Sequence, residues 1–339
     1  MISFSYQLIA PKIITPKLIM INQTENEVLV RPKYLALCHA DQRYYRGQRS
    51  AEALKKKLPM ALIHEAVGEV INDPKGQFEK GEDVVLIPNI GGESSEFIAE
   101  NYQKGSAFRS SGIDGFMQEY VLMPHDRLVS AKNVTDRVTL SIAEFISVAC
   151  HCVSRLQKKL TTPAKTVGIW GDGNLGYVVA NVVRIMIPDA KIYIVGRSVE
   201  KLRLFTFADE VYADEILPDG FAVDHAFECT GGAGCDYAVN DIIAHINPEG
   251  LIMLMGVSEN KVPIFTRDIL EKGLTVVGSS RSGRIDFEQA VKLMSDNSFA
   301  ERIRLIISDI MDVKSVGDIS KAFEKDSNNM YKTVLRWNI

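Results

Sequence analysis

The spacing of apolar residues changes partway along the chain. In residues 1 to about 145, short apolar runs at 28–31, 67–71 and 84–87 are separated by turn sequences such as 73–76, and this pattern predicts short strands. From about residue 148, strand-like runs alternate with helical patterns. The predicted strands are 167–170, 191–195, 211–213, 223–227, 250–255 and 274–278, and the predicted helices are 144–158, 174–186, 198–206, 235–245 and 266–272.

This alternation predicts an α/β fold with a doubly wound parallel sheet. After residue 278 come a helical pattern at 287–295 and a final apolar run at 333–337. That tail is too short to be a domain, so we expect it to return and complete the first part. The predicted domains are therefore a β-rich unit of 1–147 with 284–339, and a parallel-sheet unit of 148–283.

A glycine-rich turn lies where the first predicted strand of the parallel sheet meets its helix. Gly171, Gly173 and Gly176 follow the apolar run that ends at Trp170, with Asn174 and Leu175 between the last two glycines. In dinucleotide-binding proteins these glycines allow a tight turn, close approach of the pyrophosphate and close helix packing, while the helix N-terminus offers free N–H groups. The turn predicts a dinucleotide site. The alternative is a glycine-rich turn without a ligand.

The end of the second predicted strand indicates which dinucleotide is bound. An NAD site usually has an acidic residue here, for the ribose 2′-hydroxyl. This chain has Gly196 and Arg197 instead, with Lys201 following, and Asp189 comes before the strand. A glycine leaves room for a 2′-phosphate and an arginine can bind it with a planar fork of donors, so we predict NADP(H). Alternatively, Arg197 and Lys201 are solvated surface charges.

Composition and charge restrict the class of protein. The 339 residues are 46% hydrophobic and 24% charged, which suits a globular chain with two domains and a large core. The net charge is −4 and the one compact basic run is 55–57, so we expect neither a nucleic-acid-binding nor a membrane-surface protein. We see neither a membrane span nor a signal peptide, and the five cysteines suggest reduced thiols, so we expect a cytoplasmic protein.

Residues typical of a catalytic zinc site are present in the β-rich part. Cys38 and Asp41 follow an apolar run, His64 and Glu65 precede another, and Glu144 opens a predicted helix. Catalytic zinc sites keep three protein ligands from different elements and one open position. Taken singly, a buried free cysteine or a structural His–Glu pair explains these residues equally well.

Four motifs together resemble the zinc-dependent medium-chain alcohol dehydrogenases over essentially the whole chain. They are Cys38-x-Ala-Asp41, His64-Glu65-x-x-Gly68, the run at 81–85 and the glycine turn at 171–176, in the order of that family. The resemblance implies a GroES-like β-rich catalytic domain and a Rossmann domain. It also implies one catalytic zinc held by Cys38, His64 and Glu144, with Glu65 beside the metal and able to coordinate it.

Longer strings resemble the ribulose-5-phosphate reductases, which supply ribitol 5-phosphate for bacterial teichoic acids and capsules. The matching stretches are 38–45, 57–60, 108–112, 114–117, 170–176, 224–229 and 278–283. This resemblance implies reversible hydride transfer between NADPH and C2 of ribulose 5-phosphate, whose carbonyl oxygen binds zinc. It further implies a functional partner, a ribitol-5-phosphate cytidylyltransferase that makes CDP-ribitol, and we expect a homodimer. The alternatives are an NADP-linked dehydrogenase of another polyol and a catalytically silent NADP-binding protein.

Two departures from the classical alcohol dehydrogenases affect these expectations. The lobe that often holds a structural zinc should lie near 90–112, which contains no cysteine, so we expect one zinc. Ala40 stands where the proton-relay hydroxyl usually is, which leaves water, Glu65 or Tyr44 as proton donor.

Two further sets of side chains need an interpretation. The substrate phosphate requires cations, for which Arg43, Arg49 and Arg109 are candidates. Arg43 is preferred because it lies close in sequence to Cys38 and Asp41.

The run 150–152, Cys-His-Cys, looks like a metal cluster, but on a helix neighbouring side chains point in different directions. We interpret it as core packing.

Overall fold

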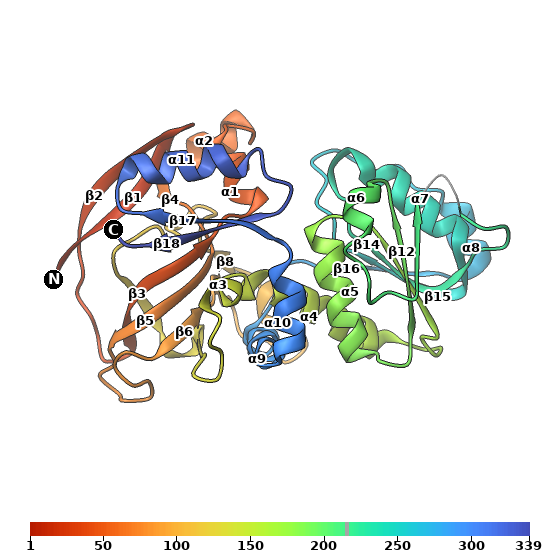
Figure 1. The fold of residues 1–339 in the computed structure, drawn as a ribbon, viewed down its shortest axis with the longest axis horizontal. Coiled ribbons are helices and arrows are strands. Elements are labelled where there is room, and N and C mark those ends of the chain that lie inside the picture. The colour runs from red at the N-terminus through yellow and green to blue at the C-terminus, as the bar shows by residue number, and fades with distance from the viewer. Residues whose placement is uncertain (214–216) are drawn as a thin grey trace. The chain divides into compact units, whose positions relative to one another are not determined.

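The computed structural model describes residues 1–213 and 217–339, which form two compact units. The first unit comprises Met1–Ser147 and Ser282–Ile339, and the second comprises Val148–Arg281. Figure 1 shows the two units with their elements labelled. The division expected from the sequence was 1–147 with 284–339, and 148–283. Among the described residues, no helix is long and apolar enough to span a membrane.

The first unit is built on a mostly antiparallel sheet. Its strand order is β10-β6-β5-β3-β18-β17, with β9 also paired to β3. The bounds are β3 Glu27–Ala36, β5 Glu65–Asn72, β6 Asp83–Leu86, β9 Val121–Pro124, β10 Leu128–Ser130, β17 Ile307–Val313 and β18 Lys332–Trp337. The last strand lies beside β3, so the C-terminal apolar run does return to the first unit. Val334, Leu335 and Trp337 are buried there, which explains why this run is apolar.

A smaller sheet of three strands, in the order β2-β1-β4, belongs to the same unit. Its strands are β1 Ile2–Ala10, β2 Ile13–Met20 and β4 Met60–Ala61. Two-residue strands β7 Asn89–Ile90 and β8 Ala107–Phe108 pair with each other. The helices are α1 His39–Tyr45, α2 Ala51–Lys57, α3 Arg137–Leu140, α9 Arg284–Met294, α10 Asn297–Arg304 and α11 Val316–Asp326, and α4 Ala143–Lys159 contains the boundary between the units.

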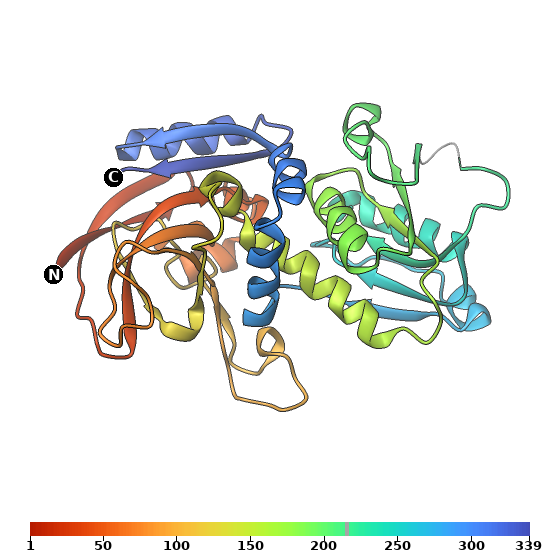
Figure 2. The same cartoon turned by 60° about the horizontal axis from the view of Figure 1, so that its bottom comes forward.

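The C-terminal helix fixes the position of α1, the helix that follows Cys38. The ring of Phe323 in α11 stacks on Tyr45 with the centroids 4.4 Å apart. The Gln42 side chain donates to the carbonyl of Phe323 at 2.8 Å and to the Asp326 carboxylate at 2.7 Å. Figure 2 shows α11 beside strands β17 and β18. Residues near the C-terminus therefore hold the first turns after Cys38 in place.

The second unit is a six-stranded parallel sheet in the order β13-β12-β11-β14-β15-β16. The strands are β11 Thr166–Trp170, β12 Lys191–Gly196, β13 Glu210–Ala213, β14 Val223–Glu228, β15 Ile246–Leu254 and β16 Thr275–Gly278. Its further helices are α5 Asn174–Met186, α6 Val199–Leu202, α7 Cys235–His245 and α8 Thr266–Lys272. The predicted α/β class and doubly wound sheet are confirmed, although α6 is shorter than predicted and β15 begins four residues earlier.

The strand order determines where this sheet binds ligands. It reverses direction between β11 and β14, and in open parallel sheets ligands bind at the carboxyl ends of the strands on either side of such a reversal. Strand β11 ends at Trp170, directly before the glycine turn, and β14 ends at Glu228. The turn predicted to bind a dinucleotide therefore lies at the expected position in the sheet.

Candidate functional site

Three of the four predicted metal ligands lie together in the first unit. The ligand atoms of Cys38, His64 and Glu65 are all within 4.8 Å of one another. Glu65 begins β5 opposite Ala36 of β3, and Cys38 follows two residues after Ala36, so the strand register brings them together. Glu144, in the first turn of α4, contacts this group through His64, whose Nε2 lies 4.0 Å from Glu144 Oε2. His64, Glu65 and Glu144 are buried, and Cys38 is half-buried.

Asp41 organises the ligand group from within α1. As the third residue of the helix, its carboxylate accepts a hydrogen bond from the backbone N–H of Cys38, at 3.3 Å. The same oxygen, Oδ2, lies 3.4 Å from His64 Nδ1. This contact leaves Nε2 toward Glu144 and available to a metal, the arrangement in which an outer carboxylate orients a histidine ligand. One short helix therefore positions both Cys38 and His64.

The other oxygen of Asp41 holds two strained backbone positions. Oδ1 accepts from the N–H of Ile63 at 3.0 Å and from the hydroxyl of Ser110 at 2.6 Å. Ile63 has φ +67° and Ser110 has φ +61°, and a β-branched residue in this region is a conformational outlier. Because Ile63 directly precedes His64, its unusual conformation sets the direction of the ligand. Such strain persists where the surroundings hold it, and it clusters at functional sites.

Burial and charge shift the pKa values of this pair in opposite directions. Burial alone would lower the pKa of His64, but the carboxylate of Asp41 outweighs it and the pKa lies well above its ordinary value. Burial alone would raise the pKa of Asp41, but His64 and the hydrogen bonds from Ser110 and Ile63 lower it. Asp41 is therefore an ionised carboxylate that accepts from His64 Nδ1 and orients the ring, which would be neutral as a metal ligand.

Glu65 carries an oxygen without a partner. Its Oε1 accepts from the ammonium of Lys332 at 2.7 Å, and Lys332 also donates to the carbonyl of Leu37 and lies 4.8 Å from the Phe145 ring centroid. Its Oε2 is buried and makes no hydrogen bond. An unpaired buried carboxylate oxygen is costly unless a cation completes its surroundings. Beside a cysteine sulfur and a histidine nitrogen, this oxygen fits a zinc ion.

The electrostatics of Glu144 also fit a cation in this group. Burial raises the pKa of Glu144 to about 7, and the neighbouring carboxylate of Glu65 adds to the increase. Burial likewise raises the pKa of Glu65, although Lys332 opposes this. Lys332 is thus the lysine whose positive charge acts on both buried carboxylates, and it is hydrogen-bonded to Glu65. A bound divalent cation would stabilise both carboxylates in their ionised forms. The residues present therefore fit the predicted metal.

Sequence patterns had missed three neighbours of this group: Lys332, Phe108 and Ser110. The ring of Phe108 lies 5.3 Å from that of His64. Lys332 opens the buried strand β18 and is itself only 5% exposed. A lysine at the start of an otherwise apolar strand was the available signal, because a buried lysine requires an anionic partner. Phe108 and Ser110 gave no comparable signal.

The arginines considered for the substrate phosphate have different surroundings. Arg109 donates to the carbonyls of Asp114 at 3.0 Å and Leu122 at 3.3 Å, and its guanidinium lies over the Phe116 ring. These contacts occupy two of the five N–H donors of Arg109 and tie its side chain to the loop. Arg43 is half-buried in the last turn of α1, and Arg49 lies 4.9 Å from the centroid of the Tyr44 ring.

The Cys-His-Cys run at 150–152 lies inside helix α4 and is buried. Burial raises the pKa of Cys152 to about 12, so its thiol stays protonated and is a poor metal ligand. The interpretation as core packing agrees with these surroundings.

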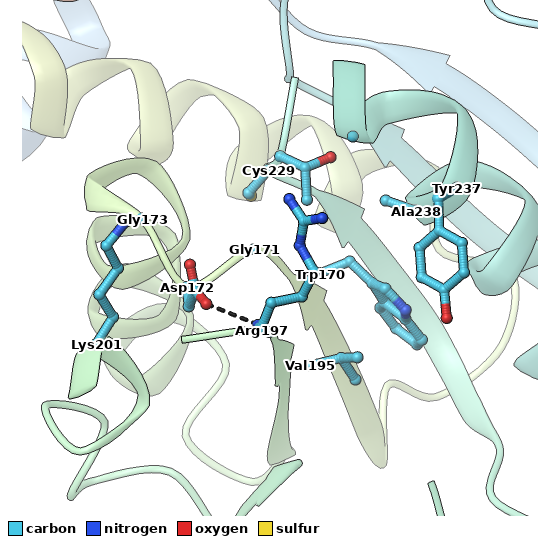
Figure 3. A pocket seen from close by; sticks show the side chains of 13 residues that line it. Trp170, Gly171, Asp172, Gly173, Val195, Arg197, Lys201, Cys229, Tyr237 and Ala238 are labelled. Atoms are coloured by element: carbon cyan, nitrogen blue, oxygen red, sulfur yellow. Dashed lines mark hydrogen bonds between the residues drawn. The ribbon is translucent and has the colours of Figure 1, made fainter. Parts of the chain in front are cut away.

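The second unit has a pocket at the carboxyl ends of β11, β12 and β14 (Figure 3). Its lining includes the predicted residues Gly171, Gly173, Gly196, Arg197 and Lys201, together with Asp172, Cys229, Thr230, Gly234 and Tyr237. Asn174, Leu175 and Gly176 form the first turn of α5 directly behind it. Gly173 precedes α5 without a side-chain cap, so the helix presents uncapped N–H groups, which suit a pyrophosphate.

The contacts of the three glycines differ. A Cβ on Gly176 would lie 1.9 Å from the carbonyl oxygen of Gly171, and one on Gly171 would lie 2.9 Å from the backbone of Cys229. A Cβ on Gly173 would meet nothing within 4 Å. Gly171 and Gly176 are thus required by the protein's own packing. Gly173 faces open space, which suits close approach of a ligand.

We therefore expect different defects from alanine at these positions. Gly176→Ala should lower the thermal stability of the protein, because backbone would have to move to relieve the clash. Gly173→Ala should leave the melting temperature near that of the wild type but weaken NADPH binding. Differential scanning fluorimetry and fluorescence titration with NADPH measure the two effects. Equal melting temperatures for both variants would contradict the assignment of Gly176 to packing.

The structure shows a further reason for a glycine at position 196, beside the room for a phosphate expected from the sequence. A Cβ at this position would lie 2.6 Å from Cβ of Asp172, so the space beside Gly196 is filled by that side chain. The Asp172 carboxylate accepts from the backbone N–H of Arg197 at 2.7 Å (Figure 3). It also accepts from the backbone N–H of Ser198 at 2.6 Å. Gly196 therefore accommodates Asp172, which fixes the start of the loop that carries Arg197. The local sequence gave no sign of this contact, because Asp172 belongs to another turn.

Family models match both units of the chain. Residues 24–133 match the alcohol dehydrogenase GroES-like domain, and residues 189–296 match the zinc-binding dehydrogenase domain. Together these matches cover the segment with Cys38, His64 and Glu65 and the segment with Gly196 and Arg197.

Full-length relatives and a solved structure are similar to this chain. It is 48% identical to the ribulose-5-phosphate reductase of Streptococcus pneumoniae over 100% of this chain and 98% of that protein. It is 49% identical to ribulose-5-phosphate reductase 2 of Staphylococcus aureus, with 100% of both chains covered. The crystal structure of S. aureus TarJ in complex with NADPH superposes with a TM-score of 0.89 at 41% identity, covering 100% of both chains. The chain therefore belongs to the zinc-binding, medium-chain alcohol dehydrogenase family, in the branch that contains the ribulose-5-phosphate reductases.

Proposed function

We propose that this protein is a zinc- and NADPH-dependent reductase that converts D-ribulose 5-phosphate to D-ribitol 5-phosphate. The observation that carries the proposal is the Cys38, His64 and Glu65 group with its unpaired, buried Glu65 oxygen, in a chain that resembles ribulose-5-phosphate reductases along its whole length. The pocket at the glycine turn supports the use of a dinucleotide.

The residues of the chain have distinct tasks in this reaction. Cys38, His64 and Glu144 would hold the zinc ion, and Glu65 lies beside it with Lys332 maintaining its charge. When bound, zinc supplies a Lewis acid to the carbonyl oxygen and NADPH supplies the hydride. Asp41 keeps the His64 ring oriented. Ala40 has no hydroxyl, so the proton comes by a route other than the usual relay, and the Tyr44 hydroxyl is hydrogen-bonded to Lys57.

Arg197 and Lys201 would bind the 2′-phosphate of NADPH. In Figure 3 the Arg197 side chain extends into the pocket, while its backbone N–H is held by Asp172. A hydrogen bond to a charged group contributes roughly 1.5–3 kcal/mol, and the loss of one weakens binding by about ten- to a hundredfold. Arg197→Ala should therefore raise KM for NADPH by this factor and leave KM for NADH nearly unchanged. An unchanged ratio of the two KM values would mean that the 2′-phosphate is recognised elsewhere.

A four-way reductase assay tests the proposed substrate and cofactor. NADPH or NADH is combined with ribulose 5-phosphate or unphosphorylated ribulose, and oxidation of the nicotinamide is followed by absorbance. We expect the highest kcat/KM for NADPH with ribulose 5-phosphate. A preference for unphosphorylated ribulose would indicate a dehydrogenase of another polyol, and no turnover in any combination would indicate a silent NADP-binding protein.

The product suggests a partner. By the family resemblance, ribitol 5-phosphate is consumed by a cytidylyltransferase that forms CDP-ribitol for teichoic acid or capsule polymers. We propose a homodimer that works with such an enzyme. Size-exclusion chromatography with light scattering, of the protein alone and mixed with the cytidylyltransferase, would detect a dimer and any complex. A monomeric mass for the protein alone would rule out the dimer.

A further inference from the structure

Lys57, the last residue of helix α2, has unusual surroundings for a lysine. Its ammonium donates to the hydroxyl of Tyr44 at 3.0 Å and to the hydroxyl of Ser111 at 2.9 Å. It lies 5.7 Å from the centroid of the Tyr44 ring. Within the part of the chain that the structure describes, it forms no ion pair, and the side chain is half-buried. Its neighbours Lys55 and Lys56 are exposed, as lysines usually are.

The polar groups around Lys57 are suited to an anion. An ammonium has three donors, and the two hydroxyls use two of them. Each hydroxyl accepts from Lys57 and so keeps its own proton to donate elsewhere. A second cation, Arg49, lies 4.9 Å from the centroid of the same Tyr44 ring. The carboxylate of Asp114, three residues after Ser111 in the chain, accepts from the Gln7 side chain and the N–H of Ala61.

Two chain segments connect these groups with the proposed metal ligands. Helix α1 begins after Cys38 and carries Tyr44 six residues later, a rise of about 9 Å. The segment 108–111 begins with Phe108 against His64 and ends with Ser111 on Lys57, and it spans at most about 11 Å. Between them, Ser110 is bonded to Asp41 at 2.6 Å. The hydroxyls that hold Lys57 therefore lie on elements anchored at the ligand group.

We propose that Lys57, with the hydroxyls of Tyr44 and Ser111, binds the 5-phosphate of the substrate. The inference rests on the proposed function, which places the carbonyl at C2 of ribulose 5-phosphate beside the metal ligands. The phosphate at C5 then reaches the Lys57 group along α1 and the segment 108–111. Lysine is a common phosphate ligand that acts as a point charge, and the two hydroxyls add directed hydrogen bonds. Arg109, in contrast, already donates to two backbone carbonyls.

Calorimetric binding of ribitol 5-phosphate and of ribitol tests this site without catalysis. Three zinc-loaded proteins are compared, each in the presence of NADP⁺: the wild type, the Lys57→Gln variant and the Lys56→Gln variant. Lys56→Gln is the matched control, because Lys56 lies on the same helix. Losing one charged contact should weaken ribitol 5-phosphate binding by about ten- to a hundredfold in Lys57→Gln. Lys56→Gln should bind as the wild type does. The dissociation constant for ribitol divided by that for ribitol 5-phosphate measures the preference for the phosphate. This ratio should fall in Lys57→Gln and stay at the wild-type value in Lys56→Gln.

The outcomes separate this inference from the function on which it rests. If the wild type prefers ribitol 5-phosphate and Lys57→Gln keeps the full preference, the phosphate site is wrong and the function stands. If the wild type binds both ligands equally, the proposed substrate is wrong, and the proposed phosphate site at Lys57 is wrong as well. Tyr44→Phe, which keeps the ring but removes the hydroxyl, provides a second variant. It should also weaken ribitol 5-phosphate binding, and an unchanged constant would remove Tyr44 from the site.

Discussion

Replacing Cys38 with serine is expected to leave the purified protein with only background zinc and without measurable reductase activity. Cys38 supplies the sulfur of the ligand group and is the N-cap of α1, so the substitution removes a thiolate and leaves the fold intact. The loss should exceed the roughly 10- to 100-fold drop in affinity that follows loss of an outer-shell partner. Metal analysis by mass spectrometry and a melting curve measure zinc content and folding.

The matched control for this substitution is Cys150→Ser. Cys150 is a buried cysteine in α4, outside the ligand group. The variant should keep its zinc. Full zinc occupancy in Cys38→Ser, or zinc loss in Cys150→Ser, would contradict the assignment.

Glu144→Ala should also lose zinc, and this variant tests the less compact part of the proposed site. Glu144 contacts His64 at 4.0 Å, whereas Glu65 belongs to the group whose ligand atoms lie within 4.8 Å of one another. The family resemblance assigns the third ligand to Glu144. Zinc analysis of Glu144→Ala and Glu65→Ala decides between them. Retention of zinc by Glu144→Ala with its loss from Glu65→Ala would transfer the ligand role to Glu65.

The second large effect is expected from Asp41→Asn, which should weaken zinc binding by about 10- to 100-fold. Asp41 is fully buried and its oxygens face the N–H groups of Cys38 and Ile63, the Ser110 hydroxyl and His64 Nδ1. An amide replaces one accepting oxygen with a donor, so some of these donors lose their partner. Each buried donor left unpaired costs about 1–3 kcal/mol, so the melting temperature should fall as well. Competition with a fluorescent chelator measures the zinc affinity.

A carboxylate–histidine pair elsewhere provides the control for Asp41→Asn. Asp73 Oδ1 lies 2.7 Å from His125 Nε2, and the Asp73 side chain is fully buried. Its carboxylate also accepts hydrogen bonds from backbone N–H groups of the turn that Asp73 begins. Asp73→Asn should lower stability without changing the zinc affinity. If Asp41→Asn behaves in the same way, Asp41 stabilises the fold and does not orient a metal ligand.

The second unit could be predicted well because its signals are local. Strands buried in a parallel sheet give continuous apolar runs, and the glycine turn directly follows one of them. In the first unit, β1 and β2 were not predicted. Strand β2 contains Pro16 and has a mostly exposed pattern, so it lacks the apolar alternation that identifies a strand.

The ligand residues could be named from the sequence, but their environment could not. Glu65 and Lys332 are separated by 267 residues, and Lys57 and Ser111 by 54. Only the pairing of β3 with both β5 and β18 brings Glu65 and Lys332 together. The same limit explains why the contact between Gly196 and Asp172, which belongs to a different turn, was not predicted. Contacts of this kind depend on the tertiary structure, and local spacing does not identify the partner residue.

The most direct test of the central claim is transfer of a labelled hydride. The zinc-loaded protein is incubated with ribulose 5-phosphate and NADPH that carries deuterium at both C4 positions of the nicotinamide, and the product is analysed by mass spectrometry and NMR. The account predicts ribitol 5-phosphate with one deuterium, at C2, and loss of turnover when a chelator removes the zinc. No deuterium at C2, or full turnover in the zinc-free protein, would contradict it.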